Sequence, residues 1–378
     1  MLHSTKSRIL AMFGVTALAV AGLPAAAAGD DDKHDDNHGD DVKVIASGLN
    51  SPRGLVFGPD GALYVAESGK GGDGPCFEGP EGPSCFGESG SVTRISMSGD
   101  QSRVLTGMPS IAAKGTGEAG LGPSDVSFHK DQMFVTVGLG LDLDVSKKIP
   151  ALDDMGQLVK ADPHENEWKT VADLADFEDK FNPTGDEENV NPNSVVDTPH
   201  RGQIVADAGA NDLLLVRPNG KVKVLATFPN VMVDAPPNMG LPPQVEMDFV
   251  PTSVARGPKG ALYVGQLTGF PFPVGGASVH RVMPNGDVKV RATGFTNIID
   301  IAIDEKGRLY VLEIFKNGLL SGDPTGALIR VGKGGMQHEI MAEGLITPGG
   351  LVLHGDHAFV SNCGTCAGGG EVLKIDLD

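Results

Sequence analysis

The chain has 378 residues and a formal net charge of −19, from 49 acidic and 30 basic residues. Such an acidic surface repels phosphate backbones and anionic lipid headgroups, which argues against nucleic acid as a partner and against a stable membrane anchor. Glycine (53) and proline (26) are abundant, whereas aromatic residues make up 5% of the chain. This turn-rich composition predicts an all-β protein with little room for helices.

The first 28 residues have the features of a secretory signal peptide. Lys6 and Arg8 form a basic start, an apolar run follows over 9–23, and the alanines at 26–28 offer a cleavage site. Residues 29–41 are rich in aspartate and predict an acidic disordered spacer, because such a run cannot bury apolar surface; its Asp and His side chains could also collect metal loosely. We therefore expect a secreted or periplasmic protein with one folded domain over 42–378.

A short phrase recurs six times in this domain: a strand, a tight turn such as Pro-Asp-Gly, and a second apolar strand. Successive phrases lie 70, 70, 59, 47 and 49 residues apart. Such spacing is typical of propellers with inserts. The second strands are expected at 62–67, 132–137, 202–207, 261–266, 308–313 and 357–362. Each repeat reads as four antiparallel strands, which predicts a six-bladed β-propeller.

The last repeat lacks a fourth strand of its own, because the chain stops soon after its third strand at 371–375. The segment 42–49 reads VKVIASGL and matches the fourth strands at 222–229 and 288–295. We therefore predict that residues 42–47 complete the C-terminal blade. This pairing would close the ring and leave few exposed strand edges.

Loop lengths distinguish the two faces of the expected ring. Connections from strand 1 to 2 and from 3 to 4 are mostly tight, whereas the other two classes carry inserts, at 68–90, 107–124, 138–155, 173–193, 228–251, 267–277 and 314–326. Antiparallel alternation puts all of these inserts on one face. Long loops on a rigid scaffold often bind ligands, so we expect a small molecule or an extracellular protein to bind there. The alternative is that the inserts arose by neutral drift and have no binding function.

Polar residues are expected around a central tunnel, where first strands begin and second strands end. Converging carboxylates and amides favour a hard cation, so calcium is the candidate cofactor, although none is certain. The candidate metal ligands are Glu67, Asp125, Asn193, Asp207, Asp300 and Glu313. One alternative is that these groups cap strand ends and accept backbone N–H bonds with water between them, and another is that they bind a substrate directly.

Other residues on the same face are candidates for contact with a ligand, namely Arg53, Asn193, Gln266, Phe270, Phe272 and Asn362. Phe270 and Phe272 would form an exposed hydrophobic lip, or would instead pack over their blade. In a calcium-assisted hydrolase or isomerase, Asp300 or Glu313 would serve as the base. The chain contains neither an HExxH nor a G-x-S-x-G motif, which disfavours a zinc enzyme and a serine hydrolase.

The four cysteines of an exported chain indicate disulfides. Local pairing of Cys76 with Cys85 and of Cys363 with Cys366 is the preferred arrangement. Cross-pairing between the two groups would instead join the first and last blades. The Cys-Gly-Thr-Cys phrase lacks the βαβ context of a redox motif.

Five longer phrases, at 51–72, 205–216, 250–277, 294–314 and 326–335, form a broader pattern. Together they resemble the ScyD/ScyE family of exported propeller-like proteins, with GFPFP and FTNIID the most specific parts. The PDGALYV phrase is also similar to NHL repeats and to SMP-30/gluconolactonase propellers. The resemblance implies export and a propeller but no settled reaction, and Ser124 and Gln266 stand where the family commonly has His and Glu. SMP-30-like lactonases hold calcium in the tunnel, and Glu67, Asn193 and Asp300 occupy broadly comparable blade positions.

Overall fold

The computed structural model describes residues 42–79, 82–199 and 201–378. The signal peptide and the acidic spacer expected from the sequence lie outside these residues. The described chain is predominantly β-structure, and its two α-helices are α1 (Leu143–Ser146) and α2 (Leu174–Phe181). Neither helix is long and apolar enough to cross a membrane.

Six antiparallel sheets of four or more strands make up most of the described chain. The first sheet contains β2 (Pro52–Phe57), β3 (Leu63–Glu67), β5 (Gly82–Ile95) and β4 (Gly74–Gly79), and β6 (Gln101–Ala113) also pairs with β5. The second sheet contains β7 (Pro123–His129), β8 (Gln132–Val137), β10 (Gln157–Asp162) and β11 (Glu167–Asp173). The third sheet contains β13 (Pro192–Thr198), β14 (Gly202–Asp207), β15 (Asp212–Val216) and β16 (Val222–Thr227).

The next three sheets repeat this meander. They are β19 (Pro251–Arg256), β20 (Leu262–Gln266), β21 (Ala277–Val282) and β22 (Val288–Phe295); then β23 (Ile298–Ile303), β24 (Leu309–Glu313), β25 (Thr325–Arg330) and β26 (Glu339–Ile346); then β27 (Gly350–His354), β28 (His357–Asn362), β29 (Ala367–Asp376) and β1 (Val42–Asn50). Two small sheets pair β9 (Leu141–Asp142) with β12 (Asn189–Val190) and β17 (Val231–Asp234) with β18 (Gln244–Met247).

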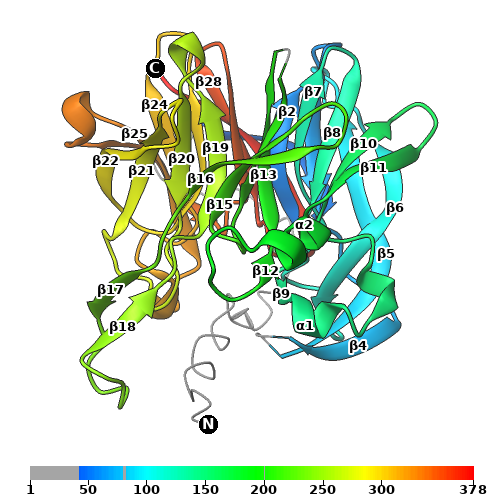
Figure 1. The fold of residues 1–378 in the computed structure, drawn as a ribbon. Helices are drawn as coiled ribbons and strands as arrows, with labels where there is room; N and C mark the ends of the chain where they lie inside the picture. The colour runs from blue at the N-terminus through cyan, green and yellow to red at the C-terminus, as the bar shows by residue number, and fades with distance from the viewer. Residues whose placement is uncertain (1–41, 80–81, 200) are drawn as a thin grey trace, which may run out of the picture.

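The first strand of each large sheet contacts the first strands of its two neighbours. The cyclic order is β2, β7, β13, β19, β23, β27 and back to β2 (Figure 1). The sheets therefore radiate from a common axis, as the blades of β-propellers do.

The last large sheet joins the two ends of the described chain. β1 runs antiparallel to β29, with Val42 opposite Ile375 and Val44 opposite Leu373. Ala46 and Leu49 of β1 are buried. The predicted pairing of residues 42–47 with the C-terminal strands is confirmed.

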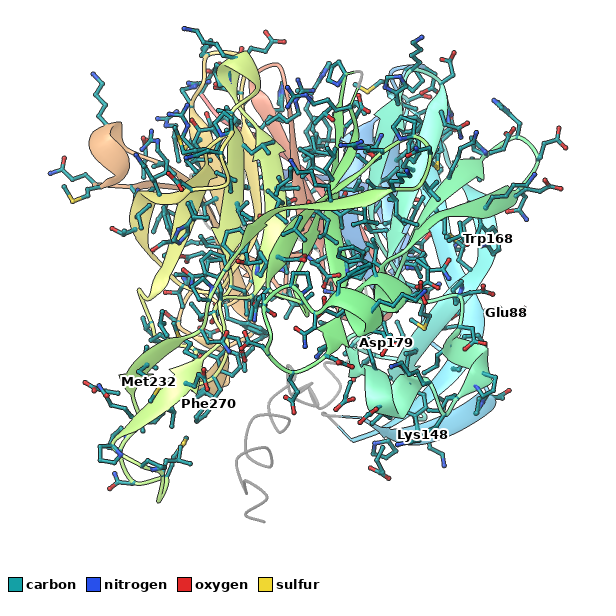
Figure 2. The ribbon with its side chains drawn as sticks, viewed as in Figure 1. Glu88, Lys148, Trp168, Asp179, Met232 and Phe270 are labelled. Carbon is teal, nitrogen blue, oxygen red and sulfur yellow. A yellow bond between two sulfur atoms is a disulfide. The ribbon has the colours of Figure 1, made fainter. Side chains whose placement is uncertain are left out.

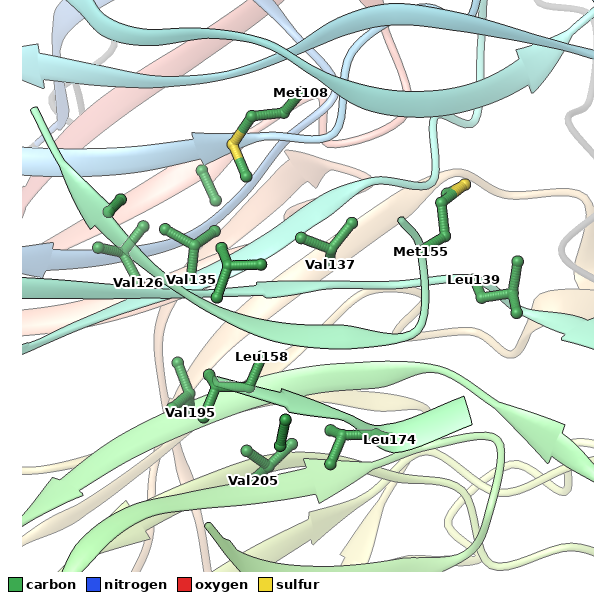
Figure 3. Packing of buried hydrophobic residues seen from close by; sticks show 14 of the residues in the cluster. Met108, Val126, Val135, Val137, Leu139, Met155, Leu158, Leu174, Val195 and Val205 are labelled. Carbon is green, nitrogen blue, oxygen red and sulfur yellow. The ribbon is translucent and has the colours of Figure 1, made fainter. Parts of the chain in front are cut away.

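Apolar side chains fill the spaces between sheets. Figure 3 shows Val126, Val135, Leu158, Val195 and Val205 from two neighbouring sheets in one cluster. Because the middle strands are covered on both faces, they read as continuous apolar runs rather than alternating ones. Every residue of β15 and of β24 is buried.

The long inserts gather at one end of the molecule, which we call the insert face. β4, α1, β9, β12, β17 and β18 all lie at the bottom of Figure 1, as the loop lengths predict. The predicted local disulfides also form, between Cys76 and Cys85 and between Cys363 and Cys366.

Candidate functional site

The starts of the first strands surround a narrow cavity on the axis of about 10 Å³. Its lining residues are Arg53, Gly54, Ser124, Asp125, Asn193, Ser194, Thr252, Ile299, Asp300 and Gly349. The sequence therefore predicted the correct strand positions for the axis. The cavity has room for about one water molecule, whereas small-molecule sites are usually several hundred Å³ in volume.

Asp125 connects two neighbouring sheets at this cavity. Its Oδ1 accepts a hydrogen bond from the backbone N–H of Val126 (2.8 Å). Its Oδ2 accepts bonds from the N–H of Val195 (2.8 Å) and the hydroxyl of Ser194 (3.0 Å), both on β13. The carboxylate therefore clamps β7 to β13.

Asp300 forms the equivalent clamp between β23 and β27. Its two oxygens accept bonds from the N–H of Ile301 and from the N–H of Leu351, each at 2.7 Å.

Burial raises the pKa of Asp125 to about 7. Burial, and then the negative charge of Asp125, raise the pKa of Asp300 well above its usual value. These two acids therefore influence each other across the axis.

The uncharged polar groups of the cavity make similar connections. Asn193 donates its side-chain amide to the carbonyl of Thr252 (2.6 Å). Thr252 donates its hydroxyl to the carbonyl of Ile298 (2.7 Å), and Ser124 donates to that of Pro192 (2.6 Å). Arg53 donates through Nη2 to the carbonyl of Gly120 (3.0 Å). The axial polar ring thus holds the sheets together.

The polar residues at the ends of second strands have a different, repeated role. Glu67, Asp207, Glu313 and Asn362 each accept a bond from a backbone N–H 16 or 17 residues earlier, in the segment that enters the first strand of their own sheet. The bonds run from Asn50 to Glu67 (2.7 Å), Asn191 to Asp207 (2.7 Å), Thr296 to Glu313 (2.6 Å) and Ile346 to Asn362 (2.8 Å). These four side chains therefore hold the entering segment to the end of the second strand.

The expected convergence of six metal ligands on the axis is wrong. Asp125, Asn193 and Asp300 line the cavity, whereas Glu67, Asp207 and Glu313 do not. The reason is that a second strand lies one strand farther from the axis, so that its last side chain faces the entering segment. Glu67 is also held by Arg103, whose guanidinium donates to both carboxylate oxygens (3.0 and 2.9 Å).

The aromatic lip expected at Phe270 and Phe272 does not form. Both side chains are buried, at 8% and 7% exposure, in a cluster with Leu267, Phe315 and Leu319. Gln266 is buried as well. These residues support the insert face from within, because the loops that carry them fold back over their sheets.

Exposed apolar side chains instead occupy the tips of three inserts on this face. We call them the insert patch: Val231, Met232, Met239, Val274 and Leu320, which are 42–69% exposed. The β17–β18 hairpin packs through Leu241 and Val245 on the cluster that contains Phe270. In Figure 2, Met232 and Phe270 both lie at this end of the molecule. The patch was not predicted from the sequence, because the inserts were recognised there by their length alone.

No protein-family model and no curated protein matches the chain. Solved structures with a similar fold include a gluconolactonase from Xanthomonas campestris (10% identity, TM-score 0.52, covering 90% of this chain and 91% of that chain). Another is a Bacteroides thetaiotaomicron protein of unknown function (10% identity, TM-score 0.53, covering 89% of this chain and 75% of that chain). A third is a PQQ-bound aldose sugar dehydrogenase from Streptomyces coelicolor (14% identity, TM-score 0.50, covering 89% of this chain and 97% of that chain). At these identities, the likeness shows a propeller-like fold alone.

Among the described residues, no group of three or more His, Cys, Asp or Glu side chains could hold a metal ion. At the axis, two carboxylates and one amide provide fewer oxygens than the six to eight that calcium takes. Each carboxylate oxygen there also already accepts a bond from a backbone N–H. The axial residues do not by themselves fit a calcium ion.

Proposed function

We propose that the chain is an exported, six-bladed β-propeller of the ScyD/ScyE type that binds an extracellular protein through its insert face. Six sheets in cyclic contact and the closing strand β1 support six blades in one domain over 42–378. The GFPFP and FTNIID phrases support the family.

The insert patch is the observation that carries the binding function. Its five apolar side chains are exposed on loops that are themselves anchored to a buried cluster. Exposed apolar side chains that gather at one end of a molecule can mark an interaction site. Methionines such as Met232 and Met239 adapt to partners of varied shape. The axial cavity, by contrast, has room for little more than water.

Site-specific photo-crosslinking tests this function. A photoreactive amino acid at Met232 should give a discrete protein adduct when the chain is secreted by its own cells. The matched control is Met97, which is 67% exposed in the turn between β5 and β6. We expect an adduct at position 232 that is absent at 97 and is lost when Val231 and Val274 are replaced by Ser. Equal labelling at both positions, or none, contradicts the proposal, and an adduct of small mass would indicate a small molecule instead.

The alternative expected from the sequence is a calcium-assisted, lactonase-like hydrolase or isomerase at the axis, where the residues do not by themselves fit a calcium ion. The supporting observation is that Asp125, Asn193 and Asp300 meet at the axis of a fold shared with a gluconolactonase. Asp300 would then be the base, because Glu313 does not line the cavity. Lactone turnover by the purified protein that disappears with a chelator and in Asp300→Asn would favour this function. Absence of turnover with added calcium would exclude it.

A further inference from the structure

A groove of about 760 Å³ lies between the second and third large sheets. Its walls come from β11 and α2 and from the turn that leads into β16. β11 and β16 are the outermost strands of their sheets, and no residue of the insert patch or of the axial cavity lines the groove. Pockets for small molecules usually span about 300–1,000 Å³. Unlike the axial cavity, this groove has room for an organic ligand.

One wall of the groove is apolar and aromatic. Val171, Phe177 and Val222 are partly buried and pack against the cluster shared by the second and third sheets. Phe181 lies four residues after Phe177, hence on the same side of α2, and the two ring centroids are 5.0 Å apart. Phe181 is 66% exposed and is the only phenylalanine among the exposed large apolar side chains of the described chain. Its ring is therefore available to a ligand in the groove.

A glycine sets the end of the groove formed by the third sheet. Gly220, in the turn between β15 and β16, has a φ of 79°, and a Cβ there would come within 2.5 Å of the carbonyl oxygen of Val171 on β11. Only glycine allows this approach in this conformation. The turn is closed by bonds between Arg217 and Lys221 and between Gly220 and Arg217, each at 2.9 Å. Asn219 and Lys221 therefore extend from a fixed backbone beside β11.

The charged groups of the groove leave one cation without a counterion. Asp173 accepts the N–H of Asp176 (2.8 Å) as the N-cap of α2, and Asp176 pairs with Lys180 (2.6 Å). Lys221 forms no ion pair with any residue that the structure describes. It belongs to the segment 217–223, RPNGKVK, which contains three basic residues and no acidic one. In a chain with a net charge of −19, this is a local excess of positive charge beside an apolar wall.

We propose that this groove, called the α2 groove below, binds a small aromatic carboxylate. The aromatic body packs on Phe177 and Phe181, since aromatic rings prefer tilted or edge-on contacts with one another. The carboxylate accepts bonds from the ammonium of Lys221 and from the side-chain amide of Asn219. The oxygen of that amide already accepts the N–H of Lys221 (3.2 Å), which leaves its nitrogen as the donor. Charge-assisted bonds to a carboxylate are stronger than bonds between neutral groups.

The same residues disfavour the other classes of small ligand. A cation would meet the ammonium groups of Lys180 and Lys221, whereas a purely apolar molecule would give Lys221 no acceptor. The inference does not depend on the protein proposed to bind the insert face, because the two surfaces share no residue.

Calorimetric titration of the purified full chain with 2-naphthoate tests the proposal. In about 0.15 M salt, charges more than ~8 Å away are largely screened. We expect saturable binding at one site, with an affinity about tenfold higher than for the neutral analogue 2-naphthalenemethanol. Lys221→Gln should lower the affinity for naphthoate about tenfold and leave that for the neutral analogue unchanged. Phe181→Ala should weaken the binding of both probes by about tenfold, because it removes the exposed ring.

The matched controls are Lys223→Gln and Met97→Ala. Lys223 lies on the same strand as Val222 and is exposed, but it does not line the groove. Met97 is 67% exposed and lies in another sheet. Both variants should bind naphthoate as the wild type does. All four changes are at exposed residues, so the variants should fold, and an unchanged melting temperature checks this.

Three results of the titrations would overturn the proposal. They are the absence of saturable binding, equal affinity for the charged and neutral probes, and equal weakening by Lys221→Gln and Lys223→Gln. Sedimentation of the same variants tests a different occupant. Self-association of the wild type that is lost in Phe181→Ala would assign the groove to a second copy of this chain, and it would also overturn the proposal.

Discussion

Asp125 and Asp300 show how a buried carboxylate can serve the fold rather than a ligand. Each accepts one N–H bond from its own strand and one from the first strand of the next sheet. A carboxylate is suited to this position because both of its oxygens accept and neither competes as a donor. The same reasoning applies to Glu67 and Glu313 at the ends of second strands.

Asp300→Asn should therefore destabilise the protein. The amide nitrogen of Asn cannot accept the N–H of either Ile301 or Leu351, so one of these bonds is lost. We expect a loss of about 1–3 kcal/mol in the free energy of unfolding. The measurement is urea unfolding of the variant and the wild type at the same pH.

The control for this change is Asp356→Asn, because the side chain of Asp356 forms an exposed pair with Lys306 at 3.6 Å. That variant should stay within about 0.5 kcal/mol of the wild type. Equal stability of Asp300→Asn and the wild type would show that the clamp contributes nothing.

Breaking the ion pair between Glu67 and Arg103 should also destabilise the protein. The carboxylate of Glu67 is fully buried, whereas the Arg103 side chain is 42% exposed. Arg103→Met removes both guanidinium bonds and leaves a buried carboxylate with fewer partners. We expect a loss of about 2–4 kcal/mol, somewhat below that of a fully buried pair because water reaches the arginine.

Urea unfolding measures this loss, and Lys180→Met at the exposed Lys180–Asp176 pair is the comparison. That change should cost at most about 0.5 kcal/mol. Adding Glu67→Gln to Arg103→Met should recover part of the loss. No recovery in the double variant would mean that lost packing, rather than an unpaired charge, causes the effect.

At the scale of elements, the repeat located the second strands almost to the residue. The expected segments 132–137 and 202–207 are β8 and β14, and 308–313 contains β24. These strands are buried on both faces, so the sequence carries a continuous apolar run that a turn interrupts. The sequence also contains a signal for the start of four first strands. The strands β2, β7, β13 and β19 each begin at a proline, a residue tolerated at the first position of a strand.

The inserts were predictable in position but not in structure. α2 begins after Asp173, whose side chain accepts the N–H of Asp176 (2.8 Å), and this N-cap is a signal that the sequence does contain. The β17–β18 hairpin does not follow the repeat. The burial of Glu178 could not be predicted, because a glutamate in an acidic helix reads as solvated until the packing of α2 is known.

The β17–β18 hairpin is expected to be separable from the fold. It forms a sheet of its own, its partly buried residues Leu241 and Val245 pack on the neighbouring cluster, and Met247 at its end is buried. Replacing residues 231–247 with a short Gly-Ser linker should cost about 1–3 kcal/mol, the value of these apolar contacts. Circular dichroism should show the β-structure retained, while the crosslink expected at the insert patch disappears. Unfolding of this variant would show that the hairpin is part of the core.

At the scale of the whole molecule, β1 makes the ring continuous. Without Val42–Asn50, β29 becomes an edge strand whose Val372 and Ile375 are buried in the intact protein. Such an apolar edge is a template for association. A chain that starts at Ser51 should therefore melt at a lower temperature and aggregate, as sedimentation would show. A monomeric, equally stable truncated chain would argue against closure by β1.

The buried acids also give the whole molecule a defined dependence on pH. Burial raises the pKa of Asp125, Glu178 and Glu313 to about 7 and that of Asp207 to about 6, and it raises those of Asp212 and Asp300 well above their usual value. The unfolded chain releases these protons near its ordinary values, so between about pH 4 and pH 7 the folded state holds more protons. Stability must then fall as the pH rises through this range.

His280 acts in the opposite direction, since burial lowers its pKa to about 4 and stability falls as the pH drops below about 6.5. His280 and three carboxyls whose pKa is lowered, those of Asp60, Asp323 and Glu343, oppose six acids, and the more numerous acids determine the slope. The melting temperature should therefore decrease from about pH 5 to about pH 7.5. Asp212→Asn should reduce the slope, because it removes one acid whose pKa is raised by burial. Thermal unfolding across this range measures the slope, and a melting temperature that rises with pH would mean that these carboxylates are already charged and compensated in the folded protein.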